Sequence, residues 1–481
     1  NAKVGIFEDG RVFVITGDNN PIDEKNIELH ILTPISREEM PEKIILTMAG
    51  LTIMEDARQA ITAFNRQNPN YRIEIYEYVN QSDFKVGPDG FITNADEVWD
   101  QAMLRFQVDI VTGNIPDFIF QPPKEMYNQN LLLDLYPFID ADPEINREDF
   151  LPNVLAAMES SNGKLYSFGN QFAINAIVSR HELLGHIEKW TPAEIYRIIN
   201  DTQDMQFPFG TVMLRELFIR MMLFTANMGF IDWNNYLAHF DTDEFIDLLY
   251  TSMLLPSLSD IPPGIYQGDT VHEIIKMQRG EQLLKWGTFW GPSLYQLFAD
   301  SFDDMIILGL PNVNGGIYTI NASGGIGIGA STEHPDITWE FLRSLLLKTS
   351  NDFALNTYSN PYFPVRIDLF DELIEDIMKP RTRTGAGGER VEYPREVWLA
   401  QDDSGYSIEL YAMSQEKADN LRIFVKSAIP THRGIDNELW VIIQSDLEQF
   451  YAGTRSAEDT ARIIQSRAQI WLSELELIYE N

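Results

Sequence analysis

The sequence predicts an α/β protein of more than one domain, with a small β segment at its N-terminus. Three observations carry this prediction. The chain has 481 residues, which is enough for roughly two or three domains. Hydrophobic residues make up 44% and aromatic residues 12% of it, enough for large cores. From Lys43 onward, strand patterns alternate with amphipathic helix patterns, which is typical of parallel strands joined by helical crossovers.

The first forty residues have the pattern of short strands. Apolar and polar residues alternate on both sides of Asp9-Gly10, a strong hairpin turn signal, and residues 27–32 form a further apolar stretch. Two or three short strands are too few for an independent core. The segment is therefore either an appendage packed on the main body or the remnant of a larger β domain upstream, and the sequence favours neither.

The α/β pattern that follows has clear boundaries. The predicted elements are a strand at 44–48, a helix over 53–64 that ends at Asn68-Pro69, a strand at 71–75, a helix at 97–111 and a strand at 116–120. Further along, the patterns predict helices through 181–260, strands at 283–285, 305–308 and 324–330, a helix from Pro335, and a C-terminal helical hairpin whose second helix is capped by Ser456 and Asp459.

Charge and cysteine content exclude several classes of function. Acidic residues outnumber basic ones 72 to 36, so the formal charge is −36, and Arg381-Thr-Arg383 is the one basic cluster. Such a surface repels nucleic acid and anionic membranes and favours neutral or cationic ligands. The chain has no cysteine, which excludes disulfides, thiolate metal sites and cysteine nucleophiles.

The N-terminus bears on localisation. The chain opens with Asn1-Ala2 and no Met, which indicates trimming, so the missing signal or lipid-anchor sequence says nothing about the native protein. No apolar run approaches the ~20 residues that a membrane span needs.

Several motifs together resemble the extracellular solute-binding proteins of family 1, the maltose-binding-protein-like components of carbohydrate ABC importers. Met48–Tyr76 resembles the opening strand–helix–strand of that family, and Asp109–Asp117 resembles its Gly-x-x-Pro-Asp entry into the third strand. Leu133–Ile139 matches its Leu-x-Asp-Leu run, and Gly163–Phe168 resembles the Gly-Lys-x-Tyr strand before the first lobe crossing.

The second half of the chain continues the resemblance. Trp286–Trp290 stands where the family has a Gly-x-aromatic loop, Gly325–His334 with Trp339–Phe341 resembles its glycine-rich strand and following helix, and Tyr362–Arg366 resembles its Pro-x-Arg return crossing. Each motif alone is weak, whereas their order over about residues 43–478 is fairly specific.

The resemblance implies a type II periplasmic-binding-protein-like fold, with two α/β lobes joined by a hinge. It places lobe 1 at 42–170 and 323–363, lobe 2 at 171–322 and 364–481 with the C-terminal helices, and the β segment at 1–41. The chain is expected to cross between the lobes near residues 169–173, 321–325 and 362–366. It also implies capture of a sugar by an extracellular, lipid-anchored monomer that passes it to ABC transporter membrane subunits. No catalytic activity, cofactor or metal is expected.

The strongest candidate site is an aromatic cluster. Trp286, Phe289 and Trp290 stand between Gly287 and Gly291 in what the pattern suggests is a loop after a strand. Sugars bind to flat aromatic faces and to side chains that donate and accept hydrogen bonds. We therefore expect at least one of the three rings to contact the ligand; the alternative is that all three belong to the core.

Other candidates stand at the predicted crossings and at the ends of strands. Asn170 and Gln171 can bridge a neutral diol, although they can equally satisfy hinge backbone groups. Gly50, Leu51 and Gln121 follow predicted parallel strands, where α/β proteins bind ligands. The remaining candidates are Phe172 at the first crossing, the plausible rim donors Asn321 and Ser323, and Tyr362, a ring that could be platform or core.

Weaker signals lead to competing hypotheses. Gly325–Gly329 lacks the spacing of a phosphate-binding loop, so we interpret it as a strand that needs close backbone approach. The acids of residues 140–148 alternate as in a calcium loop but lack its glycine and twelfth-position Glu.

A glycoside hydrolase remains an alternative, because a pair of carboxylates cannot be found from sequence alone. A carbohydrate sensor or adhesin on the same scaffold, or a peptide ligand, also remains open.

Overall fold

The computed structural model describes most of the chain. The described residues are 3–16, 28–33, 42–87, 92–123, 126–127, 130–160, 162–202, 204–205, 207–210, 213–225, 229–233, 235–260, 270–302, 305–322, 325–347, 362–385, 388–400, 405–430 and 437–479. The chain divides into two compact units, which are described separately. The first comprises Asn1–Met48 and Ile53–Tyr76, and the second comprises Ala49–Thr52 and Glu77–Asn481.

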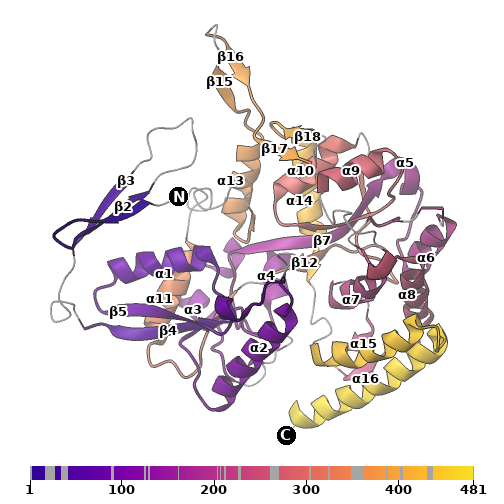
Figure 1. Cartoon of the computed structure of the whole chain (residues 1–481), viewed down its shortest axis with the longest axis horizontal. Coiled ribbons are helices and arrows are strands. Elements are labelled where there is room, and N and C mark those ends of the chain that lie inside the picture. The colour runs from indigo at the N-terminus through magenta and orange to yellow at the C-terminus, as the bar shows by residue number, and fades with distance from the viewer. Residues whose placement is uncertain are drawn as a thin grey trace. The chain divides into compact units, whose positions relative to one another are not determined.

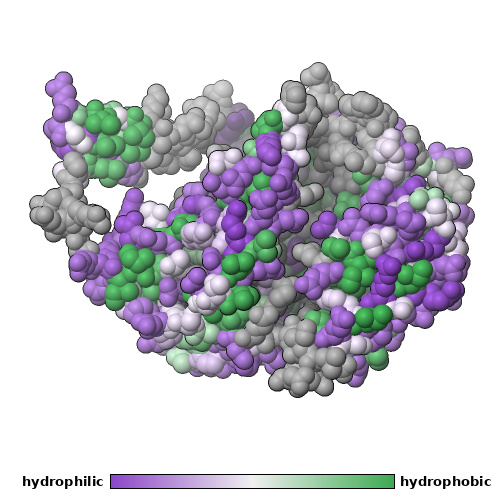
Figure 2. Space-filling view, turned by 60° about the horizontal axis from the view of Figure 1, so that its bottom comes forward, coloured by the Kyte–Doolittle hydropathy of each residue, from purple (hydrophilic) through white to green (hydrophobic). Residues whose placement is uncertain are grey.

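The first unit begins with a three-stranded antiparallel sheet. Its strands are β1 (Lys3–Ile6), β2 (Val12–Thr16) and β3 (Glu28–Leu32), with β2 in the centre. Gly10 has φ 85° at the β1–β2 turn, so the predicted hairpin is confirmed. The outer strands expose apolar side chains, with Val4 66% and Ile6 74% exposed. Figure 2 shows the resulting green surface on this sheet.

The same unit contains β4 (Ile44–Gly50, whose last two residues belong to the second unit), α1 (Glu55–Gln67) and β5 (Tyr71–Glu77). Helix α1 buries Ala57, Ala60 and Ile61, as its apolar spacing predicts. The Asn65 side-chain amide donates to the Ile73 carbonyl at 2.9 Å and accepts from its N–H at 2.7 Å. This double hydrogen bond fixes the helix against β5.

A four-stranded sheet has the order β13-β6-β4-β5, with β6 at Phe118–Phe120 and β13 at Ile326–Ile328. Strand β13 is antiparallel to β6. A Cβ on Gly327 would lie 2.8 Å from the Tyr166 carbonyl oxygen, and one on Gly329 would lie 2.2 Å from that of Pro116. The prediction that this glycine-rich strand needs close backbone approach is therefore confirmed.

The helices associated with this sheet in the second unit are α2 (Ala95–Val111), α3 (Tyr136–Ala141), α4 (Pro152–Met158) and α11 (Pro335–Leu346). Helix α2 contributes Val98, Ala102 and Phe106 to one buried cluster with Ile119 of β6. The Phe341 ring of α11 packs edge-on against Phe118 with centroids 5.2 Å apart. The predicted helix from Pro335 is confirmed.

A second sheet is built around the ten-residue strand β7 (Gln171–Arg180), which Figure 1 shows as a long arrow next to β12. Strand β7 pairs with four described strands, and all four are antiparallel to it. The partners and the strand beyond them are β10 (Lys285–Phe289), β11 (Met305–Ile307), β12 (Thr319–Asn321), β14 (Phe363–Pro364) and β19 (Ile429–Pro430). The described strands of residues 180–321 pair with β7 or with each other.

Two predicted strands have different boundaries. The strand predicted at 283–285 lies at 285–289, so the aromatic cluster lies largely within it. Gly287 suggested a loop, but its missing Cβ makes room for the Phe289 ring, whose nearest atom would lie 2.8 Å from that Cβ. The strand expected at 163–168 is reduced to one bridge between Phe168 and Ile326.

Most of the remaining elements of the second unit are helices, with four short strands between Thr382 and Leu410 and two in residues 231–238. The helices are α5 (His181–Leu184), α6 (Pro192–Asp201), α7 (Arg215–Thr225), α8 (Asp243–Leu254), α9 (Thr270–Gln278), α10 (Pro292–Ser301), α13 (Ile367–Ile377), α14 (Gln415–Ser427), α15 (Asn437–Tyr451) and α16 (Ala457–Tyr479). The short strands are β8 (Ile231–Asp232), β9 (Leu237–Ala238), β15 (Thr382–Thr384), β16 (Arg390–Glu392), β17 (Glu396–Leu399) and β18 (Ser407–Leu410).

The C-terminal helical hairpin is confirmed. The Ser456 hydroxyl accepts a hydrogen bond from the Asp459 N–H at 3.1 Å, which is the predicted cap of α16. Within the described ranges, no helix is long and apolar enough to cross a membrane.

The acids that resemble a calcium loop are engaged in ion pairs. Asp140 pairs with Arg147 at 2.6 Å, and Arg343 contacts both Asp142, at 2.7 Å, and Glu144. Among the residues that the structure describes, no group of His, Asp or Glu could hold a metal ion.

Asp142 should make stability depend on pH. Burial raises its pKa, but hydrogen bonds from the Glu144 N–H, the Trp339 indole and the Arg343 guanidinium outweigh burial, so the pKa is lowered. A lowered folded-state pKa stabilises the protein above the unfolded value of about 3.9 and loses that effect as pH falls through the folded value. Asp142→Asn should destabilise the protein at pH 7 and flatten its acid destabilisation, measured as urea midpoints.

Asp201→Asn is the matched control, because Asp201 forms an exposed ion pair with Arg197 on α6. It should change the urea midpoints little at any pH. An Asp142→Asn profile that runs parallel to that of the parent from pH 7 to pH 2 would contradict this account of Asp142.

Candidate functional site

Three segments predicted to cross between the lobes lie next to one another. Phe168 and Ile326 exchange backbone hydrogen bonds of 3.1 and 3.0 Å. At the start of β7, Ala173 pairs with Asn321 of β12, and Phe172 pairs with Phe363 of β14. The predicted crossings near 169–173, 321–325 and 362–366 therefore meet at one end of the second sheet.

An exposed pair of aromatic rings lies beside these crossings. The Phe363 N–H donates to the Trp290 carbonyl at 2.7 Å, which brings Trp290 next to Tyr362. The two rings are 6.0 Å apart between centroids and nearly perpendicular, at 86°. Trp290 is 47% exposed and Tyr362 39% exposed. Both were sequence candidates, and both offer ring surface to a ligand.

The sheet face that carries Trp290 is apolar at one end of its strands and polar further along. Alternate residues of a strand share a face. Trp286 is opposite Ile177 at the end that packs into the helical core. Next comes a polar row in which Asn175 of β7 pairs with Thr288 of β10 and with Thr319 of β12.

Two of the three residues of the polar row are buried, and the row is only partly hydrogen-bonded. The Thr288 hydroxyl donates to the Asn175 side-chain oxygen at 2.9 Å. Asn175 is 4% exposed and Thr319 is 0% exposed, and the Thr319 hydroxyl has no hydrogen-bond partner within the described residues. Sequence reasoning missed this row, although an Asn inside the apolar strand β7 was a signal for it. Two residues further along the same face come Trp290, Ala173 and Asn321.

Phe289 and Phe172 are in the core. Phe289 is 0% exposed and packs against Phe298 and Phe424, with ring centroids at 6.1 and 5.2 Å. Phe172 is 2% exposed and stacks on Phe363 at 5.4 Å. Both point to the face opposite Trp290, because their positions in the strands are offset by an odd number of residues. Both rings are therefore core residues, although both were sequence candidates for contact with the ligand.

Trp286 is intermediate between the exposed Trp290 and the buried Phe289. It is half-buried and packs on the core of the second sheet, on the same strand face as Trp290 but at its other end. Its indole N–H is buried without a hydrogen-bond partner within the described residues.

Two polar candidates, Gln121 and Asn170, are joined to the crossing segments by backbone hydrogen bonds. Gln121 is exposed and has φ 52°, a left-handed conformation unusual for a residue other than glycine. Its N–H donates to the Gly325 carbonyl at 2.8 Å, which joins it to the second crossing. Asn170 is half-buried, and its carbonyl accepts from the Val365 N–H at 3.2 Å.

Gln171 and Asn321 are half-buried at strand ends. Gln171 is the first residue of β7 and pairs with Pro364, and Asn321 is the last residue of β12. Together with Gln121, Asn170, Trp290 and Tyr362 they bring only uncharged side chains to the crossings, which suits a neutral ligand. Ser323 lies outside the described residues.

Gly50 and Leu51 stand at the end of β4. Gly50 is buried and Leu51 half-buried. Their carbonyls accept from the N–H groups of Tyr78 and Val79 at 3.1 and 2.9 Å. Strand β6, which Gln121 follows, neighbours β4 in the sheet.

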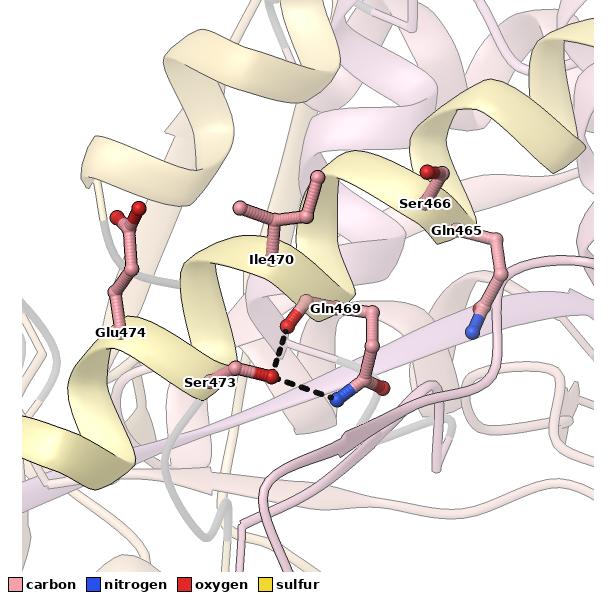
Figure 3. Close-up of a pocket in the computed structure, with 6 residues that line it drawn as sticks. All are labelled: Gln465, Ser466, Gln469, Ile470, Ser473 and Glu474. Carbon is pink, nitrogen blue, oxygen red and sulfur yellow. Dashed lines mark hydrogen bonds between the residues drawn. The ribbon is translucent and has the colours of Figure 1, made fainter.

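A pocket of about 510 Å³ lies elsewhere, along α16 (Figure 3). All of its lining residues come from this one helix: Gln465, Ser466, Gln469, Ile470, Ser473 and Glu474. The amides of Gln465 and Gln469 each bond to backbone groups of residues 236–240. None of the predicted site residues lines it, and a groove along one helix lacks the converging polar groups of a specific site.

No protein-family model matches the sequence, and a search of curated proteins finds no match. Many solved structures do match. The sugar-binding protein MalE from Xanthomonas citri superposes with a TM-score of 0.55 at 14% identity, over 91% of this chain and 99% of that one. An ABC substrate-binding protein from Listeria monocytogenes in complex with cycloalternan gives 0.50 at 13% identity, over 90% and 100%.

A third match is the maltose/maltodextrin-binding domain MalE from Bdellovibrio bacteriovorus bound to maltotriose, with a TM-score of 0.50 at 11% identity, over 89% of this chain and 100% of that one. All three are binding proteins. At these identities the likeness defines the architecture alone. The chain therefore has the periplasmic-binding-protein-like α/β fold of these sugar-binding proteins, as the sequence predicts.

Proposed function

We propose that the protein captures a mono- or oligosaccharide outside the cell and delivers it to an ABC importer, without catalysing a reaction. The observation that supports this most strongly is the exposed Trp290–Tyr362 pair beside the crossings, in a fold shared with sugar-binding proteins. Ring faces of this kind stack on the apolar C–H faces of a sugar. The exposed or half-buried amides of Gln121, Asn170, Gln171 and Asn321 would bond to its hydroxyl groups.

The proposed site lies at the crossings, with Trp290 and Tyr362 as platforms. We place Gly50-Leu51 and Gln121 on the opposite wall, because they end neighbouring strands of the other sheet. The predicted lobe boundaries, the lipid anchor and the monomeric state belong to the same proposal. Binding at a hinge would couple ligand capture to lobe closure, which a membrane partner can recognise.

A thermal-shift screen tests the proposal. Maltose, maltotriose, cycloalternan, monosaccharides, amino acids and short peptides would each be added at about a hundred times the expected Kd, which stabilises a binding protein by about 2.7 kcal/mol. We expect at least one saccharide to raise Tm by a few degrees, and chromatography to recover it unchanged. Stabilisation by peptides alone would contradict the sugar assignment, and cleavage of the saccharide would indicate a hydrolase.

A further inference from the structure

The hairpin formed by β15 and β16 has a positive net charge, whereas the protein as a whole is strongly negative. Residues 379–395 contain five basic and two acidic side chains, whereas the whole chain has twice as many acidic as basic residues. Every described residue of both strands is exposed. Figure 1 shows this hairpin beyond the end of α13.

The register places the basic side chains in a defined arrangement. Arg383 pairs with Val391, and the Tyr393 N–H donates to the Arg381 carbonyl at 2.9 Å, so these four side chains share one face. We call it the basic face. The Arg383 guanidinium lies over the Tyr393 ring at 5.8 Å from its centroid. Glu389 is an acid on the same face, and its carboxylate lies against Gly385 at the far end of the hairpin.

The arginines of the hairpin are available to a partner. In the described part of the chain, neither Arg381 nor Arg383 forms an ion pair with a carboxylate, and both are exposed. By contrast, Arg395 at the base bonds to the Asp376 carboxylate at 2.6 Å and to the Asp376 and Lys379 carbonyls at 2.8 and 2.9 Å. Arg395 thus fixes the base of the hairpin on α13, and the basic face extends beyond this base.

We propose that the basic face is a docking surface for an acidic surface of a protein partner. Guanidinium groups pair with carboxylates through two parallel hydrogen bonds, which a lysine cannot do. Arginine, tyrosine and an exposed apolar side chain such as Val391 are the mixture enriched at protein interfaces. The charge of −36 repels an extended anionic membrane or nucleic acid, whereas a compact patch of carboxylates meets mainly the local positive charge. A single hairpin makes a small interface, so docking is transient and sensitive to salt.

The test uses a short fluorescent peptide of Asp, Glu and Tyr, with a matched peptide of Asn, Gln and Tyr. We expect the full-length protein to bind the acidic peptide in low salt and to prefer it to the neutral one. Arg381→Glu with Arg383→Glu should weaken binding roughly tenfold or more, because two charge-assisted contacts become repulsive. The control is Arg66→Glu with Arg279→Glu, two exposed arginines elsewhere that undergo the same change of charge.

The outcomes separate the alternatives. Equal weakening by both double variants would show that only the net charge matters and would overturn the proposal. Binding to phosphatidylglycerol vesicles that depends on Arg381 and Arg383, without binding to the peptide, would identify a membrane instead. Saccharide-induced thermal shifts of the hairpin variant report separately on the proposed sugar site, so failure of either proposal can be recognised.

Discussion

Replacing Trp290 by alanine is expected to weaken saccharide binding roughly 5–30-fold while leaving the fold intact. The ring is half exposed beside the crossings, and stacking it on a sugar face contributes about 1–2 kcal/mol through apolar burial. Tyr362→Ala should have a similar effect, because the two rings form one pair. Isothermal titration with the saccharide that gives the largest thermal shift measures the loss, and circular dichroism follows folding.

The neighbouring residue is the matched control. Phe289 is on the same strand with its ring on the opposite face, fully buried against Phe298 and Phe424. Phe289→Ala should cost about 3–5 kcal/mol of stability by leaving a cavity, with little change in the affinity of the molecules that stay folded. If Trp290→Ala and Tyr362→Ala both bind like the parent, the aromatic pair is not the sugar platform.

Lys285→Ala is expected to destabilise the protein by about 3–5 kcal/mol, because it leaves a buried carboxylate without a counter-charge. Lys285 begins β10 and forms an ion pair with Glu273 of α9, whose side chain is only 3% exposed. The Glu273 carboxylate also lies against Gly210, where a Cβ would be 2.4 Å from its oxygen, so it is closely packed on that side. Urea unfolding followed by tryptophan fluorescence measures the effect.

Two further variants distinguish a buried pair from a general charge effect. Lys285→Met combined with Glu273→Leu removes both charges and should recover most of the loss. Lys417→Ala breaks a more exposed pair with Asp300 and should cost about 0–1 kcal/mol. A Lys285→Ala protein as stable as Lys417→Ala would show that the Glu273 carboxylate is adequately solvated without its partner.

The sequence predicted features whose causes are local. The β1–β2 turn requires the positive φ that Gly10 supplies, and the apolar stripe of α1 is the face that packs. The alternate glycines of 325–329 indicated close approach of backbones, and carbonyl oxygens of Tyr166 and Pro116 occupy that space. Each of these signals lies within a few residues of the structure that it specifies.

The features that the sequence did not reveal depend on distant residues. Gly287 is typical of a loop unless the position of the Phe289 ring is known, and that ring is held by Phe424 from α14. Periodicity could not assign Phe289 and Trp290 to opposite faces without the strand boundaries. The row of Thr288, Asn175 and Thr319 exists only through the register of three strands, whose members are far apart in the chain.

Hydrogen–deuterium exchange with and without bound saccharide tests the location of the site most directly. With maltotriose, or whichever saccharide gives the largest thermal shift, the account predicts slower exchange in peptides that cover residues 170–173, 290, 321–322 and 362–366. Peptides over the α16 groove at 465–474 should exchange at unchanged rates. Protection confined to 465–474, or protection that avoids the crossing segments, would contradict the proposal that Trp290 and Tyr362 hold the sugar.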